Sequence, residues 1–390
     1  MNNIIIIGGG PSGMMAAISA KLHNNNYEVI LIEKNNELGR KLKLTGGGRC
    51  NITANVSNSE IINNICKNNK FMYSSLNNFN AQDIIKFFED NNCPLKEEDH
   101  HRMFPKSNKS IDIVNTLYNK MIELNIKIML NSEVLDITDK YVKLETNKIF
   151  YEYLIIATGG IILPNTGSDG KGYEFAKKFN HTITELLPAE VPLVSNSQVI
   201  KEKTLQGLSF KDITLNIYYK NKIYKSITHD LIFTHFGLSG PAALRASFDI
   251  INLLKKQESV DVKIDFLNNY EFEQLLNTND LQNIYQQNNL PNRLIKYLET
   301  ISNNKEELIK NLKAFNINIY TTRGFKSAFV TNGGINLKEV DPKTFKSKLN
   351  NKISFCGEIL DLNAYTGGYN ITMALSSGYT AGKYVKIKGR

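Results

Sequence analysis

The first thirty-five residues constrain the fold more than any other part of the chain. A short apolar, β-branched run at Ile4–Ile7 is followed by a glycine loop and by an amphipathic stretch from Pro11 to about His23. Residues Tyr27–Glu33 form a second apolar run. Short apolar runs between turn residues are typical of strands that are buried on both faces. Strand, glycine turn, helix and strand together predict a βαβ unit with two parallel strands.

The glycine loop has the spacing Gly8-x-Gly10-x-x-Gly13, and Glu33 ends the second predicted strand twenty residues later. Gly8 permits a tight turn, Gly10 lets the backbone approach a pyrophosphate, and Gly13 allows the helix to pack closely on the strand. The helix N-terminus offers N–H groups to phosphates, and Glu33 can accept hydrogen bonds from an adenosine ribose. A glycine turn without a ligand is the alternative, and the acid in register disfavours it. We therefore predict a dinucleotide site.

Other segments extend this first domain. Ile126–Leu130 predicts a third parallel strand, and Leu154–Ala157 predicts another buried strand. Between them, Val134–Glu152 has the pattern of a short antiparallel meander. Near the C-terminus, Ile353–Cys356 resumes strand character and Tyr369–Val385 is expected to be a closing helix.

The middle of the chain has a different pattern. Apolar and polar residues alternate at 213–219 and at 260–266, which predicts half-buried antiparallel strands. Residues 272–315 have a helical period that is broken at Pro291. We expect a separate β-rich domain with a small helical insertion.

Two distant segments indicate which dinucleotide is bound. Gly39–Asn51 is a basic loop with three consecutive glycines, whose cations could neutralise a pyrophosphate or fix the edge of a flavin ring. A solvated basic loop is the alternative. Phe355–Glu358 ends a strand in a carboxylate, and Thr366–Asn370 leads into the last predicted helix, whose N-terminus could stabilise a reduced flavin. Halves of one site so far apart in sequence favour FAD.

A series of sequence blocks is spread over nearly the whole chain, and the blocks occur in this order: IIIIGGGPSGMMAA, GRKLKLTGGGRCNIT, RMFPKS, ATGG, TGSDGKGY, FTHFGLSGPAAL, VTNGGINLKEV and CGEILDLNAYTGGYNITMALSSG. With these blocks the sequence resembles the HI0933-like flavoproteins, which are NAD(P)/FAD-dependent or aminoacetone-oxidase-like oxidoreductases. Ala54 departs from the pattern, where asparagine would be expected after the threonine.

The resemblance implies an α/β fold: a Rossmann-like FAD-binding domain with an inserted β-barrel-like domain that carries a small helical subdomain. We expect the FAD-binding domain at 1–190 and 345–390, the β-rich domain at 191–268 and 317–344, and the helical insertion at 269–316. By position in the family's blocks and in the dinucleotide motif, the expected FAD contacts are Gly8, Gly10, Ser12, Gly13, Glu33, Lys34, Arg40, Lys41, Gly48, Arg49, Cys50, Asn51, Val134, Thr158, Gly159, Glu358, Asp361, Gly368, Tyr369, Asn370 and Ile371.

The residues that handle the substrate are less constrained. His235 could donate a proton opposite the flavin, because histidine titrates near neutral pH, or it could order its own loop. Cys50 and Tyr369 are further catalytic candidates near the expected flavin. The pair His100-His101 has no third ligand at a suitable spacing, so we predict no metal site.

We therefore expect an FAD-dependent oxidoreductase that passes hydride through flavin N5 to a small organic acceptor, such as an enone, or to oxygen. A second glycine motif is absent from the sequence, so electrons would come from transiently bound NAD(P)H or directly from the substrate. One alternative is a flavoprotein that binds RNA in a tRNA-modification role, and another is a flavin-bound scaffold without turnover.

The charge and cysteine content bear on partners and location. The 390 residues include 47 Lys+Arg and 38 Asp+Glu, a net charge of +9, and several lysines follow Lys383 near the end. We identify no basic stripe interleaved with aromatic residues, which disfavours nucleic acid as a partner. The four cysteines are widely spaced, as in proteins of the reducing cytoplasm. The uncharged run Ile4–Ala20 is interrupted by glycines, so we expect neither a signal peptide nor a membrane span. The sequence leaves the oligomeric state open.

Overall fold

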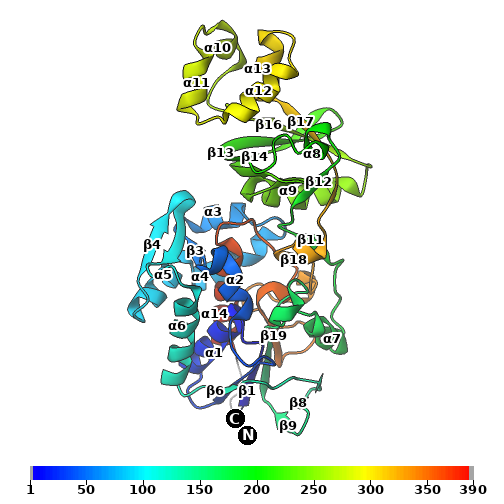
Figure 1. The fold of residues 1–390 in the computed structure, drawn as a ribbon. Helices are drawn as coiled ribbons and strands as arrows, with labels where there is room; N and C mark the ends of the chain where they lie inside the picture. The colour runs from blue at the N-terminus through cyan, green and yellow to red at the C-terminus, as the bar shows by residue number, and fades with distance from the viewer. Residues whose placement is uncertain (1–2, 386–390) are drawn as a thin grey trace. The chain divides into compact units, whose positions relative to one another are not determined.

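The computed structural model describes residues 3–385, which group by their contacts into two units (Figure 1). The first unit comprises Met1–Leu187 and Val330–Arg390, and the second comprises Pro188–Phe329. Residues 330–344, which we had assigned to the β-rich domain, group with the first unit. The division into three domains remains our proposal. The basic tail residues Lys386, Lys388 and Arg390 lie outside the described residues.

A five-stranded parallel sheet forms the centre of the first unit, with the strand order β19-β10-β1-β2-β6. Its strands are short and rich in isoleucine, and those in the middle of the sheet are buried on both faces, as the apolar runs predict. The strands are β1 (Asn3–Ile7), β2 (Glu28–Ile32), β6 (Lys127–Met129), β10 (Tyr153–Ile156) and β19 (Ile353–Phe355).

Helices α1 (Pro11–His23) and α14 (Tyr369–Lys383) pack closely against each other, although they lie at opposite ends of the chain. Two glycines of α14 make this approach possible. A Cβ at Gly378 would lie 2.2 Å from the carbonyl oxygen of Ser12, and one at Gly382 would lie 2.4 Å from that of Ala16. The C-terminal helix therefore belongs to the same layer as the helix of the βαβ unit.

The remaining elements of the first unit surround this core. The helices are α2 (Arg40–Leu44), α3 (Asn58–Asn63), α4 (Tyr73–Asn78), α5 (Ala81–Asp90), α6 (Ser110–Glu123) and α7 (Lys171–Lys178). One small sheet contains β3 (Thr53–Ala54), β4 (Leu95–Glu98) and β5 (Arg102–Pro105), and the predicted meander contains β7 (Asp136–Ile137), β8 (Tyr141–Lys143) and β9 (Lys148–Phe150). The chain passes between the units at β11 (Leu187–Ala189) and β18 (Val330–Asn332).

The second unit is a closed antiparallel barrel with the order β12-β15-β14-β13-β16-β17. Alternate residues of its long strands, such as Leu215, Ile217 and Val262, fill its core. Its strands are β12 (Leu193–Ser195), β13 (Ser209–Tyr219), β14 (Lys222–Phe233), β15 (Gly237–Ser239), β16 (Val260–Asp265) and β17 (Phe315–Thr322). Its helices are α8 (Gln198–Lys201), α9 (Pro241–Leu254), α10 (Phe272–Asn277), α11 (Leu281–Gln287), α12 (Asn292–Thr300) and α13 (Lys305–Lys313). Helices α10 to α13 form the helical insertion, and the predicted fold class is confirmed.

Within residues 3–385, every helix is too short or too polar to traverse a lipid bilayer.

A buried histidine links the two sequence segments of the first unit, because it contacts Glu339 and Ser347 in the segment that begins at Val330. His181 Nε2 lies 2.8 Å from Ser347 Oγ, and Nδ1 lies 3.2 Å from the carboxylate of Glu339. The ring also meets Phe355 edge-on at 4.7 Å. Burial lowers the pKa of His181 below its ordinary value of 6.5, because the loss of hydration outweighs the attraction of Glu339.

This histidine should make folding stability depend on pH. Below about pH 6.5, His181 is protonated in the unfolded chain but stays neutral in the folded chain. The contribution of His181 to the free energy of unfolding is therefore complete above that pH. As the pH falls, this contribution should decrease by up to about 1.4 kcal/mol per pH unit until the lowered pKa is reached. Urea unfolding at about pH 7.5 and about pH 5.5 measures this loss. The variant His181→Gln should lose less free energy over that interval, whereas equal losses would rule out His181 as the source.

Candidate dinucleotide-binding site

The glycine loop between β1 and α1 leaves open space beside only one of its three motif glycines. Gly8 has a φ of +108°, and a Cβ there would lie 2.5 Å from the carbonyl oxygen of Ala157. A Cβ at Gly13 would lie 1.8 Å from the carbonyl oxygen of Gly8. Around a Cβ at Gly10, by contrast, no described atom lies within 4 Å. Gly8 and Gly13 are therefore needed for packing, and Gly10 faces free space at the start of α1.

Helix α1 begins at this open space with its own backbone groups available. Pro11 is its first residue, and among the described side chains none caps the helix or places an acid in its first turn. Proline at this position lacks an N–H that would be unpaired in any case. The N-terminus therefore presents the positive end of the helix dipole to whatever occupies the space at Gly10.

Glu33 lies at the same edge, directly after β2. Its Oε2 accepts a hydrogen bond from the Gly9 backbone N–H at 2.7 Å. Its Oε1 accepts hydrogen bonds from the backbone N–H of Asn35 at 2.9 Å and from Nδ2 of the same residue at 2.7 Å. These bonds hold the buried carboxylate beside the glycine loop, where the motif predicts a ribose partner.

Two of the predicted lysines form ion pairs across long stretches of sequence. Lys41 Nζ lies 2.7 Å from Glu358, whose other oxygen accepts the backbone N–H of Thr331 at 2.7 Å. Lys34 Nζ lies 2.6 Å from Asp169. The Lys41–Glu358 pair joins the basic loop to the C-terminal segment, as a site assembled from distant halves requires.

The two predicted arginines also have protein partners. Arg40 donates to the side-chain oxygens of Asn35 and Asn36 at 3.0 and 2.7 Å. The guanidinium of Arg49 lies 4.1 Å from the centre of the Phe104 ring, and its Nη1 donates to both carboxylate oxygens of Glu98 at 2.9 Å.

Hydrogen bonds from Lys96 and Arg49 hold the pKa of Glu98 below its ordinary value. Glu98 lies on β4, and no sequence motif points to it.

The Cys50–Asn51 step brings the basic loop to the start of α14. Cys50 is fully buried in a left-handed conformation with a φ of +62°. Burial raises the pKa of its thiol to about 12, which favours a packing role over a catalytic one. Asn51 Oδ1 is buried and has no hydrogen-bond partner in the described part of the chain. A Cβ at Gly368 would lie 3.0 Å from that oxygen, so the orphaned amide lies beside the N-cap of α14.

The first turn of α14 is held in place by two side chains. Asn370 Oδ1 accepts the backbone N–H of Ala364 at 2.9 Å, and its Nδ2 donates to the carbonyl oxygen of the same residue at 2.7 Å. Thr372 and Thr53 share a buried hydrogen bond of 2.7 Å. The Asn370 side chain, predicted as an FAD contact, thus shapes the loop before α14. Tyr369 is buried at the first position of the helix, and Ile371 is half-buried.

Four other predicted contacts lie around the sheet. Asp361 forms an ion pair of 2.5 Å with Lys67. Thr158 Oγ1 is buried without a hydrogen-bond partner among residues 3–385, and Gly159, with a φ of +75°, follows it. Val134 is buried in the segment between β6 and β7.

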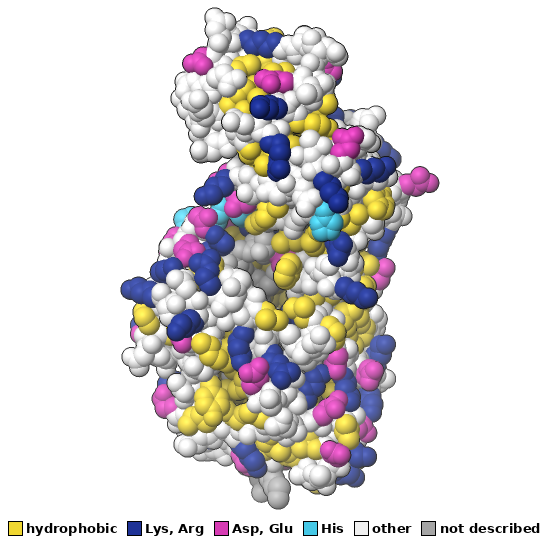
Figure 2. Space-filling view, viewed as in Figure 1, with side chains coloured by type: hydrophobic (Ala, Val, Ile, Leu, Met, Phe, Trp, Pro, Cys, Tyr) yellow, Lys and Arg dark blue, Asp and Glu magenta, His cyan; other side chains and the backbone are white. Residues whose placement is uncertain are grey.

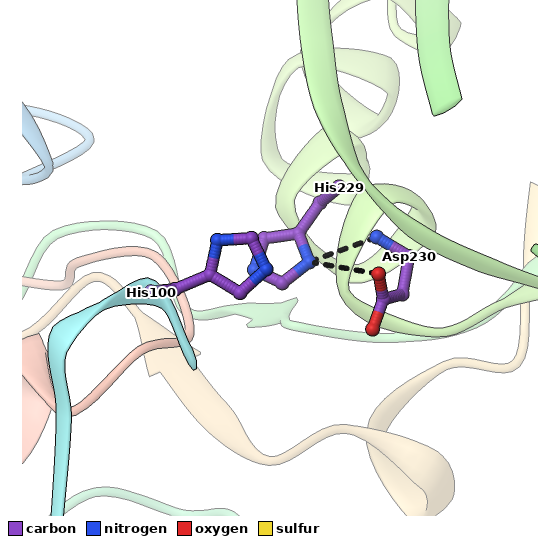
Figure 3. Close-up of side chains that lie close together, drawn as sticks. All are labelled: His100, His229 and Asp230. Atoms are coloured by element: carbon purple, nitrogen blue, oxygen red, sulfur yellow. Dashed lines mark hydrogen bonds and ion pairs between the residues drawn. The ribbon is translucent and has the colours of Figure 1, made fainter. Parts of the chain in front are cut away.

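The predicted proton donor lies in the other unit. His235 is exposed in the loop between β14 and β15, with its ring 5.0 Å from that of Phe236. On β14, the Asp230 backbone N–H donates to His229 Nδ1 at 2.8 Å, and the Asp230 carboxylate lies 4.0 Å from that nitrogen (Figure 3). The third side chain in Figure 3, His100, belongs to the first unit. In the second unit, His229 and Asp230 offer only two ligand atoms. A zinc centre needs three or four protein ligands, so we propose no metal.

Comparison with known proteins adds a family and several relatives. The family described as HI0933-like protein Rossmann domain matches residues 2–384. A 3-dehydro-bile acid delta(4,6)-reductase from Clostridium scindens is 27% identical, with 98% of each chain covered. Ribosomal RNA dihydrouridine synthases from Haemophilus influenzae and Escherichia coli are 30% and 28% identical, with 96% of each chain covered.

Solved structures support the fold. The quinol fumarate reductase subunit FrdA of E. coli superimposes with a TM-score of 0.53 at 15% identity, covering 99% of this chain and 70% of that one. A 3-ketosteroid delta1-dehydrogenase from Sterolibacterium denitrificans gives 0.52 at 10% identity, covering 99% of both chains. At these identities the likeness concerns the fold alone.

Proposed function

Because the chain belongs to the HI0933-like family, we propose that it is an FAD-dependent oxidoreductase that passes hydride to a small organic acceptor. The observation that carries this proposal is the open space at Gly10, which lies at the uncapped start of α1. The buried oxygens of Asn51 and Thr158, which have no hydrogen-bond partner within residues 3–385, support it, because buried polar groups ordinarily have partners. A ligand with many hydrogen-bonding groups would supply those partners.

The residues present fit FAD in the following way. The N-terminus of α1 would hold the pyrophosphate, and Glu33 would accept hydrogen bonds from the ribose. Asn51 and the backbone at Gly368 would lie against the flavin, with the start of α14 favouring negative charge there. Lys41 and Glu358 would fix the segments between these ends. When bound, FAD accepts hydride at N5 and delivers it to the acceptor.

We propose that the acceptor contains a C=C bond conjugated to a carbonyl group. The names of two relatives support this class, since a Δ4 bond beside a 3-keto group and the 5,6 bond of uracil both have this arrangement. Hydride adds to the carbon β to the carbonyl, a proton adds to the α carbon, and NAD(P)H is oxidised to NAD(P)⁺. His235 is the proposed proton source, because its ring is exposed and an imidazole can donate a proton.

A second candidate is the same reduction carried out on uridine in RNA. It is favoured by the relative at 30% identity, which is a ribosomal RNA dihydrouridine synthase. The two candidates share the flavin site and differ only in the molecule that carries the double bond. We further propose a cytoplasmic location, which the four free thiols support.

Anaerobic mixing tests the function. The FAD-loaded protein should bleach with NADH or NADPH, and a 4-en-3-one steroid or a uridine-containing RNA should then restore the oxidised spectrum. Reoxidation by oxygen alone would identify an oxidase. A flavin that neither donor bleaches would contradict the proposal and leave an inert scaffold.

A further inference from the structure

The tip of the β13–β14 hairpin in the second unit is rich in lysine and tyrosine. Residues 218–225 read Tyr-Tyr-Lys-Asn-Lys-Ile-Tyr-Lys, with three lysines, three tyrosines and no acidic residue. This corrects our expectation that the chain has no basic stripe interleaved with aromatic residues. The stripe consists of the end of β13, the start of β14 and the turn between them (Figure 1).

The turn itself places a charge where glycine would be easier to accommodate. Tyr219 ends β13 and Lys222 begins β14, so the loop contains only Lys220 and Asn221. These two residues have φ values of +50° and +61°, as in a type I′ turn. Asparagine and glycine are preferred there, since other side chains are strained in the left-handed region. A lysine in this position keeps a cation at the tip.

A β-bulge directs one tyrosine into solvent. Ile217 pairs with Lys225 and Tyr218 pairs with Ile223, so Tyr224 has no opposite residue. Bulges of this kind re-aim a side chain. Tyr224 is 53% exposed, and its ring meets that of Tyr219 edge-on at 6.5 Å. The hairpin therefore presents an aromatic ring supported by a second one.

Among residues 3–385, three of the four lysines around these rings lack an acidic partner. Lys263 Nζ lies 4.4 Å from the centre of the Tyr218 ring, and Lys220 Nζ lies 5.3 Å from that of Tyr219. Lys225 pairs with Asp249, but within residues 3–385 no carboxylate lies within 4.0 Å of the ammonium group of Lys220, Lys222 or Lys263.

The hairpin β8–β9 of the first unit provides a contrast. Its Lys148 lies 4.5 Å from the Tyr141 ring, and Phe150 is exposed. However, residues 139–152 contain three lysines and three acidic residues, so this hairpin is electrically balanced. On the face that Figure 2 shows, Lys and Arg side chains are likewise scattered among Asp and Glu. Of the two hairpins compared, only the β13–β14 tip combines an exposed aromatic ring with lysines whose charge is not balanced by nearby acidic residues.

We propose that this tip binds single-stranded RNA, with a base stacked on Tyr224 and phosphates bound by Lys220 and Lys222. Stacking on exposed aromatic rings beside cations is how proteins hold single strands. The inference rests on the proposed reduction of uridine in RNA and names the surface that would present that substrate. A membrane surface fits less well, because the residues at the very tip, Lys220 and Asn221, are polar.

Fluorescence anisotropy with a labelled single-stranded oligouridine tests the proposal on the FAD-loaded full chain. Tyr224→Ala should weaken binding about fivefold or more, the lower end for the loss of one stacked base. The double variant Lys220→Gln/Lys222→Gln should reduce the salt dependence of log K by about 0.7 for each phosphate that the variant no longer neutralises. Lys148→Gln, from the balanced hairpin, should bind within about twofold of the wild type.

These variants alter exposed side chains, so their unfolding midpoints should match the wild type. Binding that is equal in wild type and Tyr224→Ala would overturn the proposal. So would tip-dependent binding to vesicles of phosphatidylserine without binding to RNA. Reduction of a small steroid enone does not need the tip. If the protein reduces the enone but does not bind oligouridine, this inference fails and the proposed function stands, whereas a protein without flavin contradicts the function itself.

Discussion

Replacing Gly10 with valine should strongly weaken FAD binding while the apoprotein remains folded. Gly10 has φ −78° and ψ 179°, a backbone region that valine adopts readily, and no described atom would touch its Cβ. The larger side chain would instead fill the space that we assign to the pyrophosphate. Loss of two charge-assisted hydrogen bonds at roughly 1.5 kcal/mol each would weaken FAD binding about 100-fold. The unfolding free energy of the apoprotein should change by less than about 0.5 kcal/mol.

A smaller substitution provides a graded control. Gly10→Ala adds one methyl group to the same space and should weaken FAD binding less than valine does. Equilibrium dialysis against FAD and urea unfolding of the apoprotein measure the two quantities separately. A Gly10→Val protein that holds FAD as tightly as the wild type would show that the cofactor does not use this loop.

Replacing Gly13 with alanine should destabilise the whole protein. Gly13 lies in the first turn of α1, where helix propensity alone would favour alanine by up to about 1 kcal/mol. The added Cβ would, however, lie 1.8 Å from the carbonyl oxygen of Gly8. That atom belongs to the backbone of the β1–α1 turn, so it cannot move aside as a flexible side chain could. We expect a net loss of about 3 kcal/mol, at the upper end for overpacking, together with loss of FAD.

Gly207→Ala is the matched control for this clash. Gly207 has a φ of +82°, and the described chain has no atom within 4 Å of its Cβ position. Alanine there should cost about 1 kcal/mol from backbone strain alone. The free energies of unfolding of the two variants, measured with denaturant, should therefore differ by roughly 2 kcal/mol. If Gly13→Ala is as stable as the wild type, the close packing of α1 on β1 is not required.

Local patterns made much of the first unit predictable. The predicted helix from Pro11 to His23 is confirmed at α1, and Ile126–Leu130 contains the parallel strand β6. In both, the period of the apolar residues and the turn residues at the ends act within a few positions. The small sheet of β3, β4 and β5 was not predicted, because its strands are short and the pairing of β3 with β5 joins residues far apart in sequence.

At the candidate site, the sequence predicted the turn between β1 and α1 but not the partners of the side chains around it. Glycine spacing and the acid after the second strand located the β1–α1 loop and Glu33. No sequence pattern indicates that Arg49 lies against Phe104 and Glu98, or that the amide of Asn370 binds the backbone of Ala364. Such partners depend on tertiary packing, which brings together segments that share no local signal.

Charge illustrates the same limit. The net charge of +9 says little about partners, since most of the cations described at the candidate site have a carboxylate or an amide beside them. What matters is where cations lack acidic partners, as Lys220 and Lys222 do within the described chain, and this depends on the fold. Likewise, Tyr224, on which we propose that a base stacks, is exposed because of the turn and the bulge of the hairpin.

The central claim is that the first unit holds FAD. The most direct test is to purify the full chain, release any bound chromophore by denaturation and identify it by mass, and then to measure thermal unfolding with and without added FAD. The account predicts a yellow protein that releases FAD, and an apoprotein whose unfolding temperature rises with FAD concentration. A colourless protein whose unfolding temperature does not change with FAD would contradict it.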